Sequence, residues 1–267
     1  MPTKDQHIRT ALSLFGKHTH RHDSYRLFSD SMELTALSIA NSVDLRSREP
    51  REARYLEIIK RYERDTIDFF PRFFAEITLA LEAGFADVLG DIFTRLEIHN
   101  RDRGQFFTPY PVCQMMARVT LGDATAARAL MEEKGFLTCM EPACGAGTMV
   151  IALAEAMKAE GLNYQRDLHV TAVDVDPRVV HMAYIQFSLL HIPAEVRVGN
   201  SQSGEIQERW YTPAHILGGW SYRLAVQREA TAHSASVPAE PAPAYVPPLA
   251  PEPPAAWPGK PRQLSLF

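Results

Sequence analysis

Two kinds of residue stand where a parallel sheet could hold a charged ligand: a glycine pair, Gly145 and Gly147, and an acid, Asp174, which follows 27 residues later. An apolar run precedes each position, so each stands at the end of an expected strand. Glycines at such a turn let the backbone approach a ligand, and the next helix presents free N–H groups. An acid ending the second strand can accept hydrogen bonds from ribose hydroxyls. The spacing therefore predicts a site for a nucleoside-containing cofactor.

Glu141 favours one class of such cofactors over another. It opens the run Glu141-Pro-Ala-Cys-Gly-Ala-Gly147. A carboxylate at this place repels the pyrophosphate of a dinucleotide such as NAD and attracts the ammonium of a methionine moiety. The local charge therefore favours S-adenosylmethionine as the cofactor. Cys144, in the same run, is interpreted as a small packing residue rather than a nucleophile.

Two motifs in this order resemble those of the N6-adenine DNA methylases, especially the methylation subunits of type I restriction-modification systems. The first is Asp87-Val-Leu-Gly-Asp-Ile-Phe93 followed by Arg103-Gly-Gln-Phe-Phe-Thr-Pro109, and the second is the run from Glu141 to Gly147. The resemblance covers about residues 80–205. It implies binding of S-adenosylmethionine and action on DNA. The cofactor contacts that it implies are Phe107, Thr108, Glu141, Ala143, Gly145, Gly147, Asp174 and Asn200.

The resemblance also implies roles for several of these residues. In the family the Phe-Thr-Pro loop folds over the methionine end of the cofactor, which places Phe107 and Thr108 there, with Thr108 toward the carboxylate. Glu141 then contacts the methionine amine, and Asp174 holds the ribose. Asn200 stands where the family often has Asp or Asn near the adenine. Taken singly, each acid is better explained as a surface group or a helix cap, and only the combination favours the cofactor site.

The motif that carries methyl transfer in that family is missing. N6 methylation needs a flipped adenine, whose amino hydrogens the family's Asn/Asp-Pro-Pro-Tyr/Phe motif accepts and whose ring it stacks. After Asn200 no such motif occurs, and only about 25 residues precede the proline-rich tail. The segment from Trp210 to His215 is a candidate substitute, with Tyr211 and His215 as candidate catalytic residues. Alternatively, Trp210, Tyr211 and Trp220 cover a sheet edge left by missing strands.

The segments around these motifs predict a parallel α/β unit. Apolar runs at 136–140, 168–173 and 195–198 predict strands, and 148–160 predicts a helix between the first two. Asp176-Pro177 predicts the start of another helix, because aspartate suits the cap and proline the first helical position. The fold class expected is α/β: a partial Rossmann-like S-adenosylmethionine-dependent methyltransferase sheet, preceded by a helical N-terminal region, with a disordered Pro-rich C-terminal tail.

Residues 1–100 read as helical, because good helix formers dominate and glycine and proline are sparse. Breaks are expected near Pro71 and Gly84. The basic stretch 46–64 is interpreted as a solvated helix face rather than a phosphate contact, because glutamates interleave with its arginines. Two stripes of apolar residues at helical spacing support the prediction that this region is helical. They are Met32, Ala36, Ile39, Ala40 and Val43, and then Tyr55, Ile58, Ile59 and Tyr62.

The end of the chain differs in composition from the rest. Residues 231–267 hold ten of the 19 prolines and cannot bury a core, so a disordered tail is expected. The last five residues resemble the bacterial sliding-clamp-binding peptide, Gln-Leu-(Ser/Asp)-Leu-Phe, at every position. The resemblance implies that a clamp binds Gln263, Leu264, Leu266 and Phe267. A frayed terminus, or a short strand docking back on the domain, is the alternative.

The composition limits which partners, which metal or disulfide sites and which location are expected for this chain. A net charge of -4 and a pI near 6.2 give no global attraction to nucleic acid, so DNA contact needs a local patch or a partner. Three scattered cysteines predict neither a disulfide framework nor a metal site. No apolar run is long enough for a signal peptide or a membrane span, so a cytoplasmic protein is expected.

The sequence predicts four regions and leaves three functions open. The functions that remain open are an N6-adenine DNA methyltransferase with a diverged catalytic motif, a non-catalytic DNA- and clamp-associated binding protein, and a partial methylase that needs another methylase or specificity subunit. The regions are 1–100, helical; 101–227, the S-adenosylmethionine-binding domain; 228–262, a Pro/Ala-rich disordered linker; and 263–267, the clamp-binding peptide.

Overall fold

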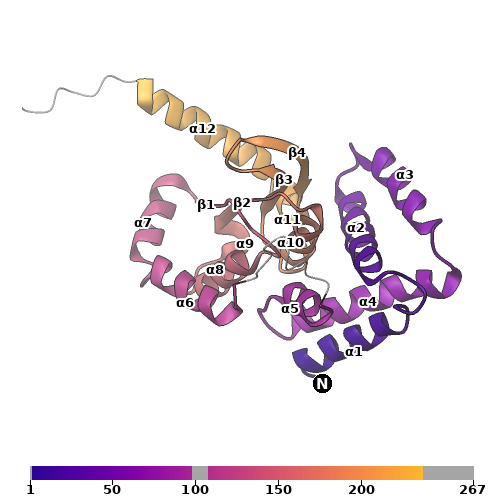
Figure 1. The fold of residues 1–267 in the computed structure, drawn as a ribbon. Coiled ribbons are helices and arrows are strands. Elements are labelled where there is room, and N and C mark those ends of the chain that lie inside the picture. The colour runs from indigo at the N-terminus through magenta and orange to yellow at the C-terminus, as the bar shows by residue number, and fades with distance from the viewer. Residues whose placement is uncertain (1, 98–107, 237–267) are drawn as a thin grey trace, which may run out of the picture. The chain divides into compact units, whose positions relative to one another are not determined.

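The structure is a computed structural model that describes residues 2–97 and 108–236. It is a mixed α/β fold, in which helices precede, connect and follow one four-stranded sheet (Figure 1). Contacts divide the chain into two units, residues 1–227 and 228–267. The helical region and the sheet share the first unit.

The N-terminal region is helical, as the composition predicted, and its described residues form five helices. Phe15, Phe69 and Phe73 pack edge-on or tilted, with ring centroids 5.2–6.0 Å apart, where the first and fourth helices meet. Burying such aromatic rings supplies much of the stabilisation of this region. The helices are α1 (Lys4–Gly16), α2 (Ser24–Val43), α3 (Arg48–Ile59), α4 (Arg64–Glu82) and α5 (Val88–Arg95).

The break predicted at Pro71 was wrong. Pro71 lies inside α4, and the helix continues to Glu82. Proline removes the N–H that would bond to the carbonyl of Ile67. Pro71 is exposed, so it lies on the solvent side of the helix, where water can bond to that carbonyl. The break near Gly84 is confirmed: α4 ends there, and Gly84 has a φ of 143°.

The three expected strands are present and parallel. Leu137 pairs with Leu168 in the first ladder, and Val170 with Ala194 in the second. The strands are β1 (Leu137–Glu141), β2 (Leu168–Asp174) and β3 (Ala194–Asn200). Among the described residues, α6 (Tyr110–Leu121) and α7 (Thr125–Lys134) lie between α5 and β1. The connections between the parallel strands hold α8 (Thr148–Ala159), α9 (Tyr164–Asp167) and α10 (Pro177–Leu189).

A fourth strand, β4 (Glu205–Tyr211), was not predicted. It runs antiparallel to β3, and its sequence, Glu-Ile-Gln-Glu-Arg-Trp-Tyr, is mostly polar because most of the strand is exposed. Trp210 is buried against the rings of His181 and Tyr184, at 4.9 and 5.4 Å between centroids. Two helices follow, α11 (Pro213–Leu217) and α12 (Trp220–Ser236). The edge of β3 is thus covered by a strand as well as by an aromatic residue.

One continuous core joins the N-terminal helices to the sheet. Val170, Val196 and Val198 of the strands are fully or almost fully buried, with Tyr184 and Phe187 of α10 in the same core. On its other side α10 packs against α2. None of the helices in the described ranges is long and apolar enough to cross a membrane.

Candidate cofactor site

Asp174 ties the glycine turn to the end of β2. Its Oδ2 accepts a hydrogen bond from the backbone N–H of Gly145 at 2.9 Å, and its Oδ1 accepts one from the N–H of Asp176 at 3.0 Å. Gly145 has a φ of 51°, in the left-handed region that favours glycine. Each carboxylate oxygen has two acceptor sites, so the half-buried Asp174 can also accept from ligand hydroxyls. The carboxylate therefore both shapes the turn and faces the carboxyl edge of the sheet.

Gly147 marks a close contact between α8 and α10. A Cβ at this position would lie 2.4 Å from Cε1 and 2.6 Å from Cζ of Phe187, which is fully buried. Gly147 also has a φ of 94°. The two glycines of the motif thus have different physical causes: Gly145 serves the turn, and Gly147 serves the packing of the helix that follows.

Glu141 ends β1 beside the turn and is half-buried. Its Oε1 accepts a hydrogen bond from the N–H of Ala143 at 3.3 Å. Burial raises the pKa of Glu141, the Ala143 N–H partly opposes this, and the Asp174 carboxylate adds to the rise. A bound cation would offset both the cost of burying the charged Glu141 carboxylate and its repulsion from Asp174. The pair of acids is therefore suited to a ligand with an ammonium group and hydroxyls.

A buried polar network, which the sequence did not predict, lies behind the turn. Asp87 accepts hydrogen bonds from Thr148 Oγ1 at 2.6 Å and from Gln186 Nε2 at 2.9 Å. Gln186 is fully buried, donates to the carbonyl of Ala146 at 2.8 Å, and accepts from the N–H of Leu89 at 3.1 Å. Burial raises the pKa of Asp87, and the hydrogen bonds that Asp87 accepts from Thr148, Gln186 and the Gly90 N–H oppose the rise. The network joins α5 and α10 to the turn and the start of α8.

Replacing Asp87 with alanine is expected to lower the free energy of unfolding by about 2–4 kcal/mol, because α5 loses its cap and Thr148 and Gln186 lose their acceptor. Asp91→Ala is the matched control on the same helix. It removes a partly exposed ion pair with Arg95 and is expected to cost less than about 1 kcal/mol. Urea unfolding followed by circular dichroism measures both. Equal losses would show that the network does not stabilise the turn.

Thr108 lies at the approach to α6 and lines a cavity of about 380 Å³ together with Asp87. One turn into α6, burial raises the pKa of the Cys113 thiol, and the carboxylates of Asp87 and Glu141 add to the rise. The start of α6 is therefore within electrostatic reach of Glu141. Phe107, the other residue implied in this loop, lies outside the described residues.

Asn200 is at the expected edge but already has partners there. It ends β3 and is exposed, and its Oδ1 accepts hydrogen bonds from the N–H groups of Gln202 at 2.9 Å and Ser203 at 3.3 Å. This is the turn that leads into β4. Ala143 is exposed in the turn after Glu141. The structure thus brings Glu141, Ala143 and the Asp174–Gly145 pair together and places Asn200 two strands away from β1.

Tyr211 and His215 lie at the opposite end of the sheet. Tyr211 pairs with Glu195, near the amino end of β3, about 17 Å along the strand from its carboxyl end. His215 is buried, with His169 Nε2 2.9 Å from its Nδ1 and Ser221 Oγ 3.0 Å from its Nε2. Burial lowers the pKa of both rings, and that of His169 to about 4. The placement favours a packing role over methyl transfer at the cofactor edge.

The thiol in the turn also fits a packing role. Cys144 is buried in the core, and burial raises its pKa well above its usual value, with Asp174 and Glu141 adding to the rise. A thiol in this state is a poor nucleophile. Within the described part of the chain, no three His, Cys, Asp or Glu side chains gather where they could hold a metal ion.

Comparison with known proteins relates residues 85–216 to a known family. A family model described as N-6 DNA Methylase matches residues 85–216, a range that contains all four strands and the Asp87 network. Neither the comparison with curated proteins nor the comparison with solved structures gave a match. Members of this family generally depend on S-adenosylmethionine. Residues 85–216 of this chain thus match the N-6 DNA methylase family.

Proposed function

We propose that this chain binds S-adenosylmethionine at the carboxyl edge of its parallel strands and serves in adenine-N6 methylation of DNA. The observation that carries the proposal is the bond between Asp174 and Gly145, with the half-buried Glu141 beside it. We propose further that the sheet is a partial Rossmann-like methyltransferase sheet, because three parallel strands end at this edge. The family match supports a DNA methyltransferase-like function.

The chain's own residues would hold and orient the cofactor. Glu141 would accept hydrogen bonds from the methionine ammonium, Asp174 from the ribose hydroxyls, and Thr108 would donate to the methionine carboxylate. When bound, S-adenosylmethionine supplies an electrophilic methyl group. Asp87 would act at one remove, because it holds Thr148 at the start of the helix behind the turn. The site would thus present the methyl group at the edge beside β1.

Glu141→Gln is expected to weaken binding of S-adenosylmethionine about tenfold or more at pH 7.5, since a neutral amide loses the charge-assisted bond to the ammonium. The raised pKa adds a pH dependence. Binding needs the ionised carboxylate, so wild-type affinity falls as pH falls through that pKa, beginning at a higher pH than for an ordinary glutamate. The glutamine variant lacks this dependence.

Equilibrium binding of radiolabelled cofactor between pH 5 and 8 measures this difference. Glu133→Gln, at an exposed position on α7, is the matched control and is expected to bind like the wild type. If the two variants showed the same affinity and the same pH profile, Glu141 would not hold the ammonium.

The proposal does not assign methyl transfer to this chain alone. Transfer to adenine N6 needs acceptors for the amino hydrogens and a surface for the flipped base. None of the residues directly after the three parallel strands (141–147, 174–176 and 200–204) is aromatic. With tritiated S-adenosylmethionine and adenine-containing duplex DNA, the isolated chain is expected to bind cofactor without transferring label. Robust transfer by the isolated chain would overturn this part of the proposal.

We propose that the last five residues bind a bacterial sliding clamp and so bring the site to DNA. The support is the sequence Gln263-Leu-Ser-Leu-Phe267 after a proline-rich stretch. These residues lie outside the described residues, and the proposal rests on the sequence alone. Tethering would raise the local concentration of a chain whose net charge is -4 near clamp-loaded DNA.

Deleting residues 263–267 is expected to abolish pull-down of the purified clamp. Deleting five residues of the proline-rich stretch, 242–246, keeps the pentapeptide and is expected to leave recovery of the clamp unchanged, because a tether of similar length remains. Equal recovery of clamp by the wild type and the 263–267 deletion would end this proposal.

A further inference from the structure

A serine and two histidines form a series of hydrogen bonds at the amino end of the sheet. Oγ of Ser221 lies 3.0 Å from Nε2 of His215, and Nδ1 of His215 lies 2.9 Å from Nε2 of His169. A hydroxyl next to a base, with a third group that orients the base, is the arrangement that activates a serine for acyl transfer. Such a triad is recognised by its geometry and not by its order in the sequence. Ser221, His215 and His169 (the triad) meet this distance requirement.

Each member of the triad comes from a different element. His169 is in β2, His215 in α11, and Ser221 in the first turn of α12. Gly218 and Gly219 connect the two helices, and the φ of 63° at Gly219 permits the tight turn before Ser221. The two histidines are buried, at 2% and 3% exposure, whereas Ser221 is exposed. Packing therefore holds the base in place, while the hydroxyl can be reached from solvent.

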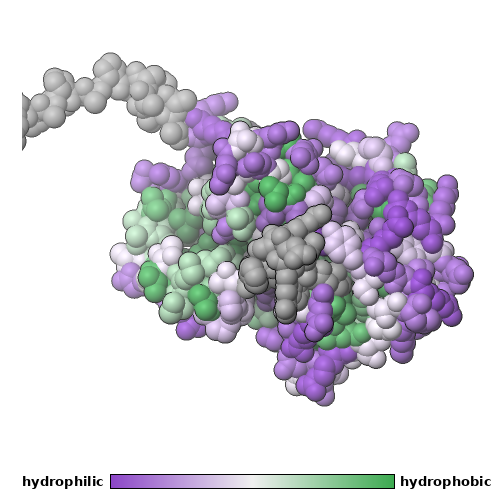
Figure 2. Space-filling model, in the orientation of Figure 1, coloured by the Kyte–Doolittle hydropathy of each residue, from purple (hydrophilic) through white to green (hydrophobic). Residues whose placement is uncertain are grey.

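The triad borders a cavity of about 610 Å³. Ligand sites in proteins typically have volumes of about 300–1,000 Å³. Both His215 and Ser221 line this cavity, so a ligand in it can contact the hydroxyl and the base together. The loop between α2 and α3 lines another side, and the visible surface of α3 is mostly hydrophilic (Figure 2). Apolar atoms in the lining come from Val43, Leu45, Tyr211, Ile216 and Tyr222.

The surrounding charges suit a base that takes up a proton. Burial lowers the pKa of His215 and lowers that of His169 to about 4, so both rings are neutral at pH 7. The Glu195 carboxylate opposes both shifts. Burial raises the pKa of Glu195 itself, but hydrogen bonds from Arg197 and Arg209 outweigh burial and keep it ionised. Glu195 thus offers a fixed negative charge to the imidazolium that forms when His215 accepts a proton.

We propose that the triad is a hydrolytic site for carboxylic esters with apolar acyl chains. His215 carries its proton on Nδ1 and donates it in a hydrogen bond to His169 Nε2, so its own Nε2 accepts the proton of Ser221. Oγ of Ser221 attacks the carbonyl carbon, and the π electrons of the carbonyl move to its oxygen. The N–H of Ser221 can donate to this oxyanion, because the amides of a first helical turn lack an acceptor within the helix.

The remaining steps return the triad to its starting state. The bond between the carbonyl carbon and the leaving oxygen breaks, and this oxygen takes the proton from His215 Nε2 and departs as an alcohol. Water then attacks the acyl group on Ser221 and gives a proton to His215, and the collapse of the second adduct returns that proton to Ser221. One ester and one water thus give one alcohol and one carboxylic acid. His169 is a positioning residue, since it acts only through His215.

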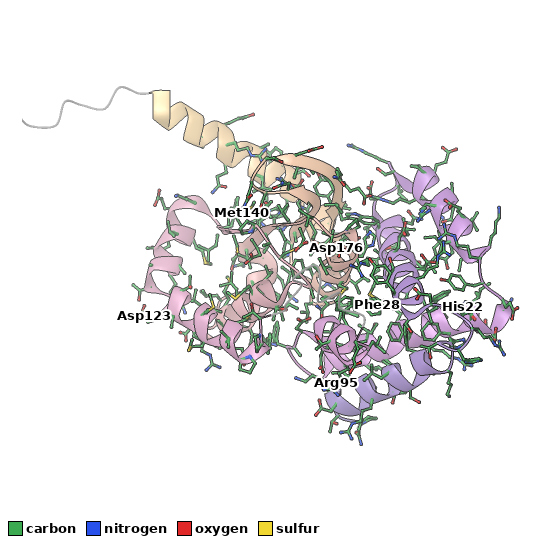
Figure 3. All side chains as sticks on the ribbon, in the orientation of Figure 1. His22, Phe28, Arg95, Asp123, Met140 and Asp176 are labelled. Atoms are coloured by element: carbon green, nitrogen blue, oxygen red, sulfur yellow. The ribbon has the colours of Figure 1, made fainter. Side chains whose placement is uncertain are left out.

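This site is separate from the proposed cofactor site. Met140 and Asp176, both labelled in Figure 3, lie near the carboxyl ends of β1 and β2, whereas His169 is the second residue of β2. The position that counts against methyl transfer by His215 therefore leaves this side chain free to act on another substrate. Ester hydrolysis at the triad needs no S-adenosylmethionine, so failure of one site says nothing against the other.

A fluorophosphonate probe tests the proposal on the full chain, because it reacts with a serine whose hydroxyl a neighbouring base activates. A biotinylated probe is expected to label Ser221, as mapped by peptide mass spectrometry, and Ser221→Ala is expected to lose the label. Ser13→Ala, at an exposed position on α1, is the matched control and is expected to react like the wild type. If Ser221 only satisfies a buried histidine, no label forms. Absence of label, or label on a different residue, would overturn the proposal.

Substitutions of the two histidines test the roles within the triad. His215→Gln is expected to slow labelling by about 100-fold or more, the contribution of a general base. His169→Phe fills the space without an acceptor for the His215 N–H and is expected to slow labelling by about tenfold. His169→Gln offers a carbonyl oxygen as acceptor and is expected to keep most of the rate. Circular dichroism checks folding, and hydrolysis of p-nitrophenyl butyrate is expected to follow the same order. Equal labelling of the wild type and a folded His215→Gln protein would contradict the proposed mechanism.

Discussion

Asp174→Ala is expected to weaken binding of S-adenosylmethionine by about 100-fold or more, to below detection in a standard calorimetric titration. The variant loses the acceptor for the ribose hydroxyls and also the bond that holds Gly145 in the turn. Two hydrogen bonds to a charged group, at about 1.5 kcal/mol each, amount to about 3 kcal/mol, which corresponds to about two orders of magnitude in Kd.

Two further variants make this result interpretable. Asp174→Asn keeps one carbonyl oxygen for the Gly145 N–H and is expected to bind about tenfold more weakly than the wild type. Glu133→Ala removes an exposed acid from α7 and is expected to bind normally. Circular dichroism checks that each variant is folded. A folded Asp174→Ala protein with wild-type affinity would remove Asp174 from the site.

Gly147→Ala is expected to lower the free energy of unfolding by about 3 kcal/mol. The new Cβ would meet the ring of Phe187 at 2.4 Å in a fully packed core, and the residue would also have to adopt a φ of 94°. The strain falls at the first turn of α8, so binding of S-adenosylmethionine is expected to be lost as well.

Gly161→Ala is the matched control for this effect. Gly161 follows the other end of α8 with a φ of 72°, and a Cβ there would meet nothing within 4 Å. The substitution thus carries the backbone strain without the clash and is expected to cost about 1 kcal/mol. Urea unfolding of the two variants separates the two contributions. Equal costs would mean that α10 yields at Phe187 and that Gly147 is only a turn residue.

The parallel strands and their glycines were predictable because their signals are local. Apolar runs ending in an acid or a glycine located β1, β2 and β3 to within two residues at each end. Asp176-Pro177 located the start of α10, and the structure confirms the cap through the Arg178 N–H. The different causes of Gly145 and Gly147 were not predictable, because Phe187 lies 40 residues away along the chain.

Other features depend on contacts that no local pattern encodes. β4 was missed because an exposed antiparallel strand needs few apolar residues, and here the pairing with β3 decides. The Asp87 network joins residues 99 positions apart. One signal could have indicated it: Gln186 stands between the apolar residues Ile185 and Phe187 in the α10 sequence, and a buried amide needs partners. Tyr211 and His215 stay predictions from the sequence, and the antiparallel direction of β4 places them at the end of the sheet away from Glu141.

The central claim is that the edge formed by Glu141, Gly145 and Asp174 is a site for S-adenosylmethionine rather than for a dinucleotide. Isothermal titration calorimetry of the full-length chain, with S-adenosylmethionine and with NAD in parallel, tests it most directly. The predicted result is saturable binding of one S-adenosylmethionine per chain and no heat with NAD. No binding of S-adenosylmethionine, or binding of NAD with equal affinity, would contradict the claim.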